Sequence, residues 1–291
     1  MKKFHYVLLF IIVATSVALK SDNPAYVLYD ADGKEVKYKN LVNDALDADI
    51  VLFGELHNNP IIHWLELELT RDVFAEKGKD LVIAAEMFET DNQLIIDEYL
   101  DGTIKQSNFE KEVKLWKNYP TDYKPLVEFA KENSLRFVAS NIPRRYASLV
   151  NGKGFEGLDS LSAEAKVLIA PLPVDYDPEL PGYKSMMDTT GSMGNSHVTP
   201  NLPKAQAIKD ATMANSILKN WQKGKLLIHY HGSFHSDNYD GIYWYLKKQN
   251  PDLKILTISS VEQDTIQNLS DGNLNLANYI ICVPSNMTKT Y

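Results

Sequence analysis

Polar side chains gather at four places in the sequence, each directly after a short apolar run. Glu55 and His57 follow the first run, Glu86 the second, Asn141 the third, and His235 closes the fourth group. Carboxylates and imidazoles transfer protons and bind divalent metal ions. If they converge, Glu55, His57, Glu86 and His235 could form one polar site with this chemistry.

The apolar runs themselves predict how these residues are positioned. They cover residues 49–53, 81–85, 136–139 and 226–230 and are typical of buried parallel strands. The carboxyl ends of parallel strands line one edge of a sheet, and ligands bind in the crevice beyond that edge. We therefore expect one pocket, which also receives Asn141, Arg144 and His231.

A helix predicted over residues 203–223 adds a further polar pair. Gln206 and Asp210 are four residues apart and share a helix face with Met213 and Ile217. Because that face points inward, the pair is expected to line the pocket. The alternative is a network of hydrogen bonds that caps the start of the helix.

Each candidate residue also has a purely structural interpretation. Glu55 could complement the N-terminal dipole of the helix that follows it, and Glu86 could form an ion pair with Arg144. His57 and His235 could each donate to a loop carbonyl group. Single residues do not separate these interpretations, whereas four such turns at one sheet edge favour a functional site.

The fold class follows from the order of the elements. Strand patterns alternate with helical ones, which predicts an α/β fold with a mostly parallel sheet flanked by helices, in a single domain over 26–291. Further strands are expected at 254–258 and 279–283. The Gly- and Pro-rich stretch 151–200 is expected to be a long loop-rich insertion, acting as a lid or binding flap.

Two local patterns are more detailed. Residues 26–38 alternate apolar and polar side chains around Asp32 and Gly33, which favours a hairpin. A helix is predicted over 60–77, because Asn59 can cap it and Pro60 suits its first position.

Composition excludes several classes of protein. Of the 291 residues 44% are hydrophobic and 23% are charged, which is typical of a globular domain. The net charge of −8 makes nucleic acid an unexpected partner. A single cysteine, Cys282, excludes an intrachain disulfide and a cysteine-based zinc or iron–sulfur site. Neither a phosphate-binding Gly-rich loop nor a G-x-S-x-G or H-E-x-x-H motif is found.

The first 18 residues have the pattern of a secretory signal peptide. Lys2 and Lys3 precede an apolar run over 6–14, and the small residues Ser16 and Ala18 suit a cleavage site. The run is shorter than the roughly 20 residues that span a bilayer. We expect cleavage and export to the periplasm or cell envelope, without lipidation, since no cysteine lies at the cut.

Five stretches resemble, in order, the ChaN family of haem-binding envelope proteins, within a superfamily that includes Tiki, TraB and erythromycin esterase proteins. The resemblance covers about residues 26–250, and the five stretches read VLFGELHNNPIIHWLELEL, AAEMFETDNQ, SNIPRR, KAQAIKDATMANSI and HYHGSFHSDNYDGIYWYL. The resemblance implies a role in haem or iron uptake, with two face-to-face haems held between two monomers. Haem, a homodimer formed on haem binding, and outer-membrane or envelope iron-uptake components are the expected partners.

The resemblance also implies roles for individual residues. Tyr123 is expected to bind the haem iron, with Tyr119 as second choice, because a phenolate is a hard ligand that suits ferric iron. The candidates that hold the haem propionates are His57, His63 and Lys124. Glu55, His57, Glu86 and His235 resemble the hydrolase signature of the superfamily. In its esterase branch a histidine would act as general base on an ester or peptide bond, with the carboxylates orienting it or holding a divalent metal ion. Two functions therefore stay open: an exported haem-binding protein, and a hydrolase that uses this signature at the strand ends.

Overall fold

The computed structural model describes residues 23–189 and 199–291 of the chain. The predicted signal peptide lies outside these ranges, as do residues 190–198 of the predicted insertion. Within the described ranges, no helix combines the length and the apolar character needed to cross a membrane.

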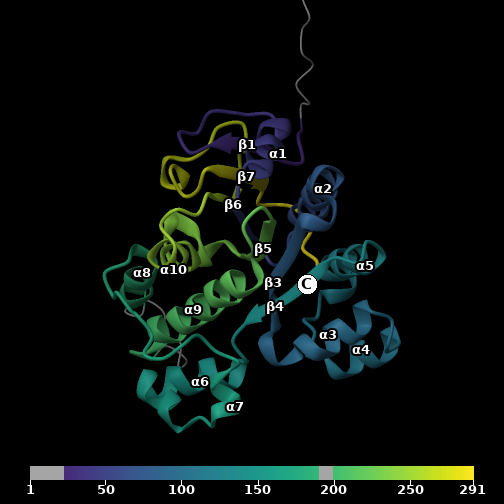
Figure 1. Cartoon of the computed structure of the whole chain (residues 1–291). Coiled ribbons are helices and arrows are strands. Elements are labelled where there is room, and N and C mark those ends of the chain that lie inside the picture. Colours follow the sequence, from purple (N-terminus) through teal and green to yellow (C-terminus); the bar gives the residue numbers. More distant parts are fainter. Residues whose placement is uncertain (1–22, 190–198) are drawn as a thin grey trace, which may run out of the picture.

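Seven strands form one sheet in the order β1-β7-β6-β2-β5-β3-β4. All neighbours are parallel except β1, which runs antiparallel to β7. The mostly parallel sheet predicted from the sequence is therefore confirmed (Figure 1). The strands are β1 (Val27–Asp30), β2 (Ile50–Glu55), β3 (Leu81–Glu89), β4 (Arg136–Asn141), β5 (Leu226–Gly232), β6 (Ile255–Gln263) and β7 (Tyr279–Pro284).

The predicted hairpin over 26–38 is present but short: the Asp30 N–H donates to the Lys34 carbonyl and the Val36 N–H to the Leu28 carbonyl, over 2.9 Å each. Tyr29 and Glu35 form one isolated bridge, and Gly33 takes a φ of 80° in the turn between them. The strand partner of β1 in the sheet is β7, more than 240 residues further along the chain. β7 offers β1 a continuous apolar strand, whereas the returning segment before Tyr38 is mostly polar and partly exposed.

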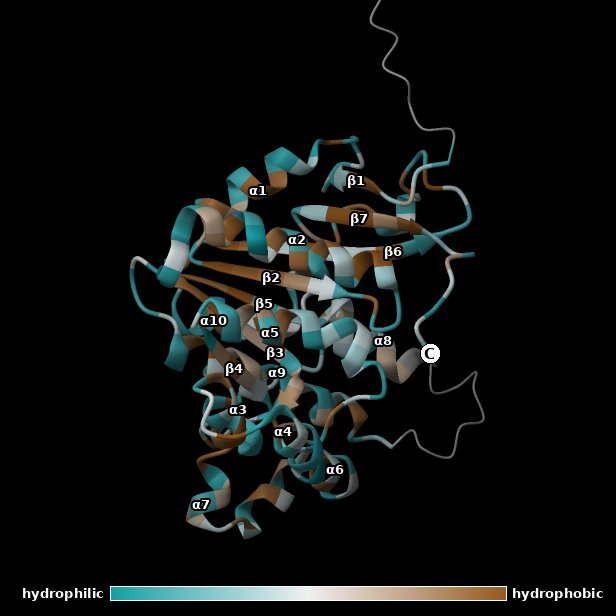
Figure 2. Ribbon diagram, turned by 90° about the vertical axis from the view of Figure 1, so that its right-hand side faces the viewer, coloured by the Kyte–Doolittle hydropathy of each residue, from teal (hydrophilic) through white to brown (hydrophobic). Residues whose placement is uncertain are grey.

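Helices cover both faces of the sheet. Side chains alternate along a strand, so Val51 and Phe53 of β2 face one hydrophobic core while Ile50 and Leu52 face the other. Because both faces are buried, the strands are hydrophobic along most of their length (Figure 2). The first core is covered by α1 (Tyr38–Leu46), α2 (Pro60–Lys77), α3 (Gln93–Leu100), α4 (Gln106–Glu112) and α5 (Lys124–Glu132), and the second by α6 (Arg144–Lys153), α9 (Leu202–Asn220) and α10 (Gly241–Gln249).

The two helices predicted in detail are both present. α2 has the predicted bounds, and the Asn59 side chain caps it by accepting hydrogen bonds from the backbone N–H groups of Ile61 and Ile62. α9 ends at Asn220, three residues before the predicted end, because Trp221 adopts an extended conformation and donates its ring N–H to the Lys225 carbonyl.

The described part of the predicted insertion contains two further short helices. These are α7 (Ala163–Lys166) and α8 (Pro181–Thr189). α8 packs against α9, and the buried Tyr183 hydroxyl donates to Asp210 over 2.6 Å. The insertion is therefore anchored on the helix that carries the predicted polar pair.

Candidate functional site

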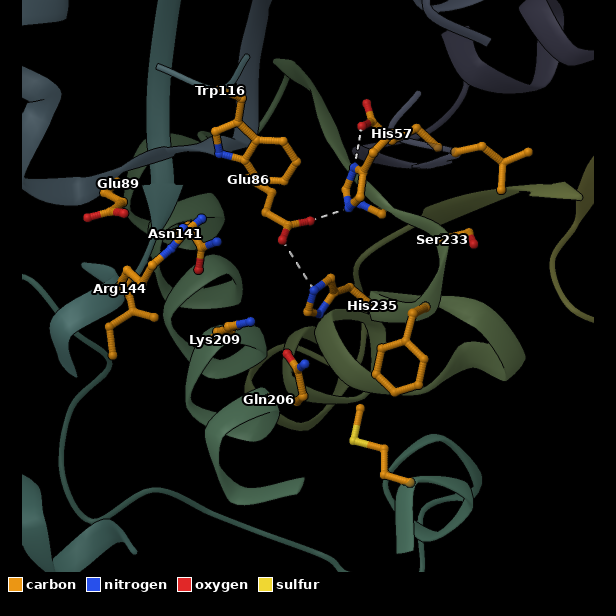
Figure 3. Close-up of a pocket in the computed structure, with 16 residues that line it drawn as sticks. His57, Glu86, Glu89, Trp116, Asn141, Arg144, Gln206, Lys209, Ser233 and His235 are labelled. Atoms are coloured by element: carbon orange, nitrogen blue, oxygen red, sulfur yellow. Dashed lines mark hydrogen bonds and ion pairs between the residues drawn. The ribbon is translucent and has the colours of Figure 1, made fainter. Parts of the chain in front are cut away.

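The carboxyl ends of β2, β3, β4 and β5 open into a cavity of about 480 Å³, here called the strand-end cavity (Figure 3). α9 and the segment after β5 close its other sides. Its lining combines acids, imidazoles, amides and cations with a few large apolar side chains. The lining residues are Glu55, Leu56, His57, Glu86, Glu89, Trp116, Asn141, Ile142, Arg144, Met186, Gln206, Lys209, Gly232, Ser233, Phe234 and His235.

Glu86 is the buried carboxylate at the centre of this cavity. One of its oxygens accepts a hydrogen bond from the Gly232 N–H over 2.9 Å, and the other lies 3.3 Å from Nε2 of His235. His57 and His235 both point toward this carboxylate from opposite sides (Figure 3). Burial alone would raise the pKa of Glu86, but the two imidazoles and the Gly232 N–H outweigh it and hold the pKa well below its usual value.

His235 is held from behind by a second carboxylate. Its Nδ1 lies 2.5 Å from Oδ1 of Asp210, which is fully buried, while Oδ2 of Asp210 accepts the Tyr183 hydroxyl. Burial opposes the charged imidazole, yet Glu86 and Asp210 together raise the pKa of His235 to about 10. His235 is therefore an imidazolium ion at neutral pH, sandwiched between two carboxylates.

His57 has the same arrangement on the opposite side. Its Nδ1 lies 2.6 Å from Oε1 of Glu55, and that oxygen also accepts the Tyr123 hydroxyl over 2.7 Å. Burial opposes ionisation, but Glu55 raises the pKa of His57 above 6.5. Both imidazoles line the cavity, and His57 is the more exposed: its side chain is 35% exposed, against 7% for His235.

Gly232 makes the close approach of His57 possible. A Cβ atom at this position would lie 2.7 Å from Nε2 of His57 and 2.8 Å from its Cε1. Any side chain at residue 232 would therefore push the imidazole away from Glu86. The glycine is part of the site although it carries no functional group.

The remaining cavity residues supply amides and cations. The side-chain oxygens of Asn141 and Gln206 are buried and have no hydrogen-bond partner among the described residues. Arg144 and Lys209 line the cavity on the same side and form no ion pair within the described part of the chain (Figure 3). Two cations and two free acceptors suit a ligand that carries an acidic group and hydrogen-bond donors.

Two of the residues expected in the pocket lie behind its wall. Asp210 reaches the cavity only through His235. His231 is fully buried, with Nδ1 3.0 Å from Nδ1 of His229 and Nε2 2.8 Å from the Ser236 hydroxyl. Burial lowers its pKa to about 4, so it is neutral. The strand alternation that places His229 and His231 together turns both away from the cavity.

Of the residues expected to bind haem, only His57 lines the cavity. Tyr123, Tyr119 and His63 are buried beneath it, and Lys124 forms an ion pair with Glu110 over 3.0 Å. The Tyr123 ring lies behind Trp116, with ring centroids 5.9 Å apart, and its hydroxyl faces inward to Glu55. Burial and the nearby carboxylates raise the pKa of Tyr123 far above its usual value.

Several lining residues were missed by sequence reasoning. Trp116 lies in a segment rich in Trp and Tyr, but the sequence does not indicate which way its side chain points. Lys209 could have been found, since it lies one turn after Gln206 on α9. The structure also reveals an adjoining side cavity of about 380 Å³ that shares Glu89, Trp116 and Arg144 with the first and adds Lys114 and Lys117.

Comparisons with known proteins show the family and the fold. A family model described as haem-binding uptake, Tiki superfamily, ChaN matches residues 41–246. The fold is similar to that of ChaN from Campylobacter jejuni, a structure reported to show cofacial haem binding. The TM-score is 0.64 at 17% sequence identity, and the match covers 88% of this chain and 96% of that one. A Bacillus cereus protein gives a TM-score of 0.50 at 12% identity, covering 84% and 90% of the two chains.

One curated relative is a plant protein. The chloroplastic protein RETICULATA-RELATED 5 of Arabidopsis thaliana is 24% identical over 196 residues. The match covers 62% of this chain but 26% of the plant protein. The chain therefore spans about a quarter of the length of that relative.

Proposed function

The chain belongs to the haem-binding uptake, Tiki superfamily, ChaN family, and from this premise we propose that it binds haem at the mouth of the strand-end cavity. Haem is a planar, largely apolar ligand with an acidic edge. A site for it must offer apolar and aromatic surface beside cationic groups.

The observation that carries this proposal is the lining shared by the two adjoining cavities. Trp116 and Arg144 belong to both, so the surface is continuous from one cavity to the other. Phe234 and Met186 add apolar area, and Phe234 is 37% exposed. The donor set fits haem: Trp116 and Phe234 suit the porphyrin, and Arg144 and Lys209 suit its propionates.

The iron ligand is the finer part of the proposal, and we assign it to Tyr123. Its hydroxyl donates to Glu55 behind Trp116. Iron binding by Tyr123 therefore requires Trp116 to move aside and this hydrogen bond to break, at a cost of about 1.5–3 kcal/mol for a bond to a charged group. When bound, haem would supply an iron centre for transport or storage.

Dimerisation and cellular role complete the proposal. The Campylobacter jejuni protein binds haem cofacially, and we extend that arrangement to two copies of this chain facing each other through their cavity mouths. The signal pattern in the first 18 residues supports export. We place the protein in haem or iron uptake in the cell envelope, with an envelope uptake component as donor or acceptor of haem.

Titration with haem, followed by absorption and by size measurement, tests the proposal. We expect saturable binding, a tyrosinate-type absorption band and a shift from monomer to dimer. Tyr123→Phe should abolish the band, while Tyr239→Phe, a partly buried tyrosine elsewhere, should keep it. Binding with an unchanged band in Tyr123→Phe would refute the ligand assignment alone. No saturable change in the wild-type protein would refute haem binding.

A second function is favoured by one specific observation: two carboxylate–imidazole pairs, His57–Glu55 and His235–Asp210, face the single carboxylate of Glu86. We propose that this arrangement can hydrolyse an ester or peptide bond. His57, in its neutral form, would take a proton from the attacking water, and the His235 imidazolium would stabilise the negative charge that develops on the substrate oxygen.

Hydrolysis of model ester and peptide substrates tests this second proposal. We expect turnover that His57→Gln lowers by at least about a hundredfold, the usual contribution of a general base. Lys124→Gln, which changes a cation outside the cavity, serves as the control. Equal rates in wild-type protein and His57→Gln would show that the site is not catalytic.

A further inference from the structure

A second polar cluster lies beneath His57 and shares only Glu55 with the lining of the strand-end cavity. It consists of Glu55 at the end of β2 and of His63 and Glu66 in the first two turns of α2. All three side chains are at most 5% exposed. One possible metal-binding atom from each residue lies within 4.8 Å of those from the other two.

Two carboxylate oxygens in this cluster have no hydrogen-bond donor. Oε1 of Glu55 accepts from Tyr123 and contacts His57, and Oε2 of Glu66 lies 3.0 Å from Nδ1 of His63. The opposite oxygens, Oε2 of Glu55 and Oε1 of Glu66, are buried without a partner among the described residues. A buried carboxylate oxygen without a partner is costly, so these two oxygens point to a bound cation.

The orientation of His63 leaves its Nδ1 directed at the two carboxylates, where it can bind a metal ion. Its Nε2 lies 3.1 Å from the carbonyl oxygen of His57, which can only accept a hydrogen bond, so Nε2 carries a proton and donates it. In a neutral ring Nδ1 then presents its lone pair toward the two carboxylates. Metal-binding histidines commonly donate their second ring N–H to a backbone carbonyl in this way.

We propose that Glu55, His63 and Glu66 bind one divalent transition-metal ion of the Zn²⁺, Mn²⁺ or Fe²⁺ type. One imidazole and two carboxylates suit ions of this class. The charges also agree, because a doubly charged cation balances the two glutamates while His63 is neutral. This site lies beneath the proposed haem surface and is linked to it through Glu55, which accepts the Tyr123 hydroxyl. Metal binding is measured on the protein without haem.

The site connects with the cavity through Glu55. One oxygen of that carboxylate would bind the ion while the other holds Nδ1 of His57, so the bound ion would fix the position of His57. Glu55 also lines the cavity, and His57 beside it is partly exposed, which gives the ion a route of entry.

A shared proton is the competing account. One proton between Glu55 and Glu66, together with an imidazolium at His63, would satisfy the same two oxygens without metal. Metal content separates the accounts directly, because a proton site binds no stoichiometric ion.

The experiment uses the full chain, stripped with a chelator and then equilibrated separately with Mn²⁺, Zn²⁺ or Co²⁺ before desalting and elemental analysis. We expect one ion per chain with at least one of them, and a rise in the thermal midpoint of about 5–10 °C at a hundredfold excess over Kd. Glu66→Gln should lose both effects. Glu68→Gln, which alters an exposed acid on the same helix, should keep both.

Glu66→Gln should fold, because its amide can donate to Oε2 of Glu55, and its metal-free thermal midpoint should equal or exceed that of the wild-type protein. His63→Gln provides a second variant, which should also lose the ion. The proposal is overturned if the wild-type protein keeps none of the three ions. It is equally overturned if Glu66→Gln and His63→Gln bind one ion per chain, as the wild-type protein does. Loss of the ion in Glu86→Gln, with the ion kept in Glu66→Gln and His63→Gln, would place the metal in the cavity instead and would also overturn the proposal.

Discussion

The pair of Asp210 and His235 should control how the stability of the protein depends on pH. His235 has a folded pKa of about 10 against 6.5 for an ordinary histidine, which corresponds to about 5 kcal/mol of preference for the charged form. Glu86 supplies the largest favourable part and Asp210 the next. Replacing Asp210 with Asn should therefore lower the free energy of unfolding by roughly 2–4 kcal/mol near pH 6.

The sign of the pH dependence follows from the raised pKa. A group whose pKa is raised by folding stabilises the protein fully below its unfolded pKa, here 6.5, and this contribution is lost as the pH rises through about 10. In Asp210→Asn the pKa of His235 in the folded protein falls. The contribution of His235 to the free energy of unfolding is then smaller at pH 6, so less of it is lost as the pH rises. The difference between the two proteins should be largest near pH 6 and should shrink toward pH 10.

Urea denaturation of both proteins at several pH values from 6 to 10 measures this difference. Asp97→Asn is the control, because Asp97 forms an exposed ion pair with Arg136 that should contribute at most about 1 kcal/mol. A loss below about 1 kcal/mol at pH 6, or an equal loss at pH 6 and pH 10, would refute the assignment of His235 as a buried imidazolium ion.

Two further substitutions probe the local geometry. Gly232→Ala should displace His57 from Glu86, which together with Glu55 raises the His57 pKa, and should therefore lower that pKa toward 6.5. An NMR titration of the imidazole measures the change. Gly152→Ala, where a Cβ meets no atom within 4 Å, should leave the His57 pKa unchanged, and an unchanged pKa in Gly232→Ala would contradict the steric argument. Asn59→Ala removes the cap of α2 and should cost about 0.5–2 kcal/mol in thermal or urea unfolding, so an unchanged midpoint would show that the cap is replaced.

Sequence patterns were sufficient for the sheet and for the edge at which the site lies. Short apolar runs separated by helices allow few arrangements other than a parallel sheet, and the direction of a parallel strand fixes which end carries the site. Glu55, Glu86 and His235 could therefore be expected to converge before any coordinates were available. The α2 bounds followed equally from Asn59 and Pro60, because cap chemistry is local.

Pairing of the side chains could not be predicted, because it depends on register and rotamers. The structural alternative in which Glu86 pairs with Arg144 is not what the structure shows: Glu86 contacts His235 and Gly232 instead. The strand β3 shifts register between Ala85 and Glu89, which changes where the side chains after Ala85 lie. No periodic pattern reveals such a shift.

Some buried polar residues within helices were also not predicted from the sequence. Glu66 lies on the inward face of α2 next to Leu65 and Leu69, where an acid interrupts a mostly apolar pattern. That interruption was a usable signal. The inward direction of Tyr123 had no such signal, because it follows from the π-helical turn Tyr119–Tyr123.

Structure determination of the protein after addition of haem tests the central claim most directly. We expect haem against Trp116 at the mouth of the strand-end cavity, with its propionates within hydrogen-bonding distance of Arg144 or Lys209. Haem bound on another surface, with Trp116 and Arg144 free of contact, would contradict the proposal that the strand ends of this sheet form the haem site.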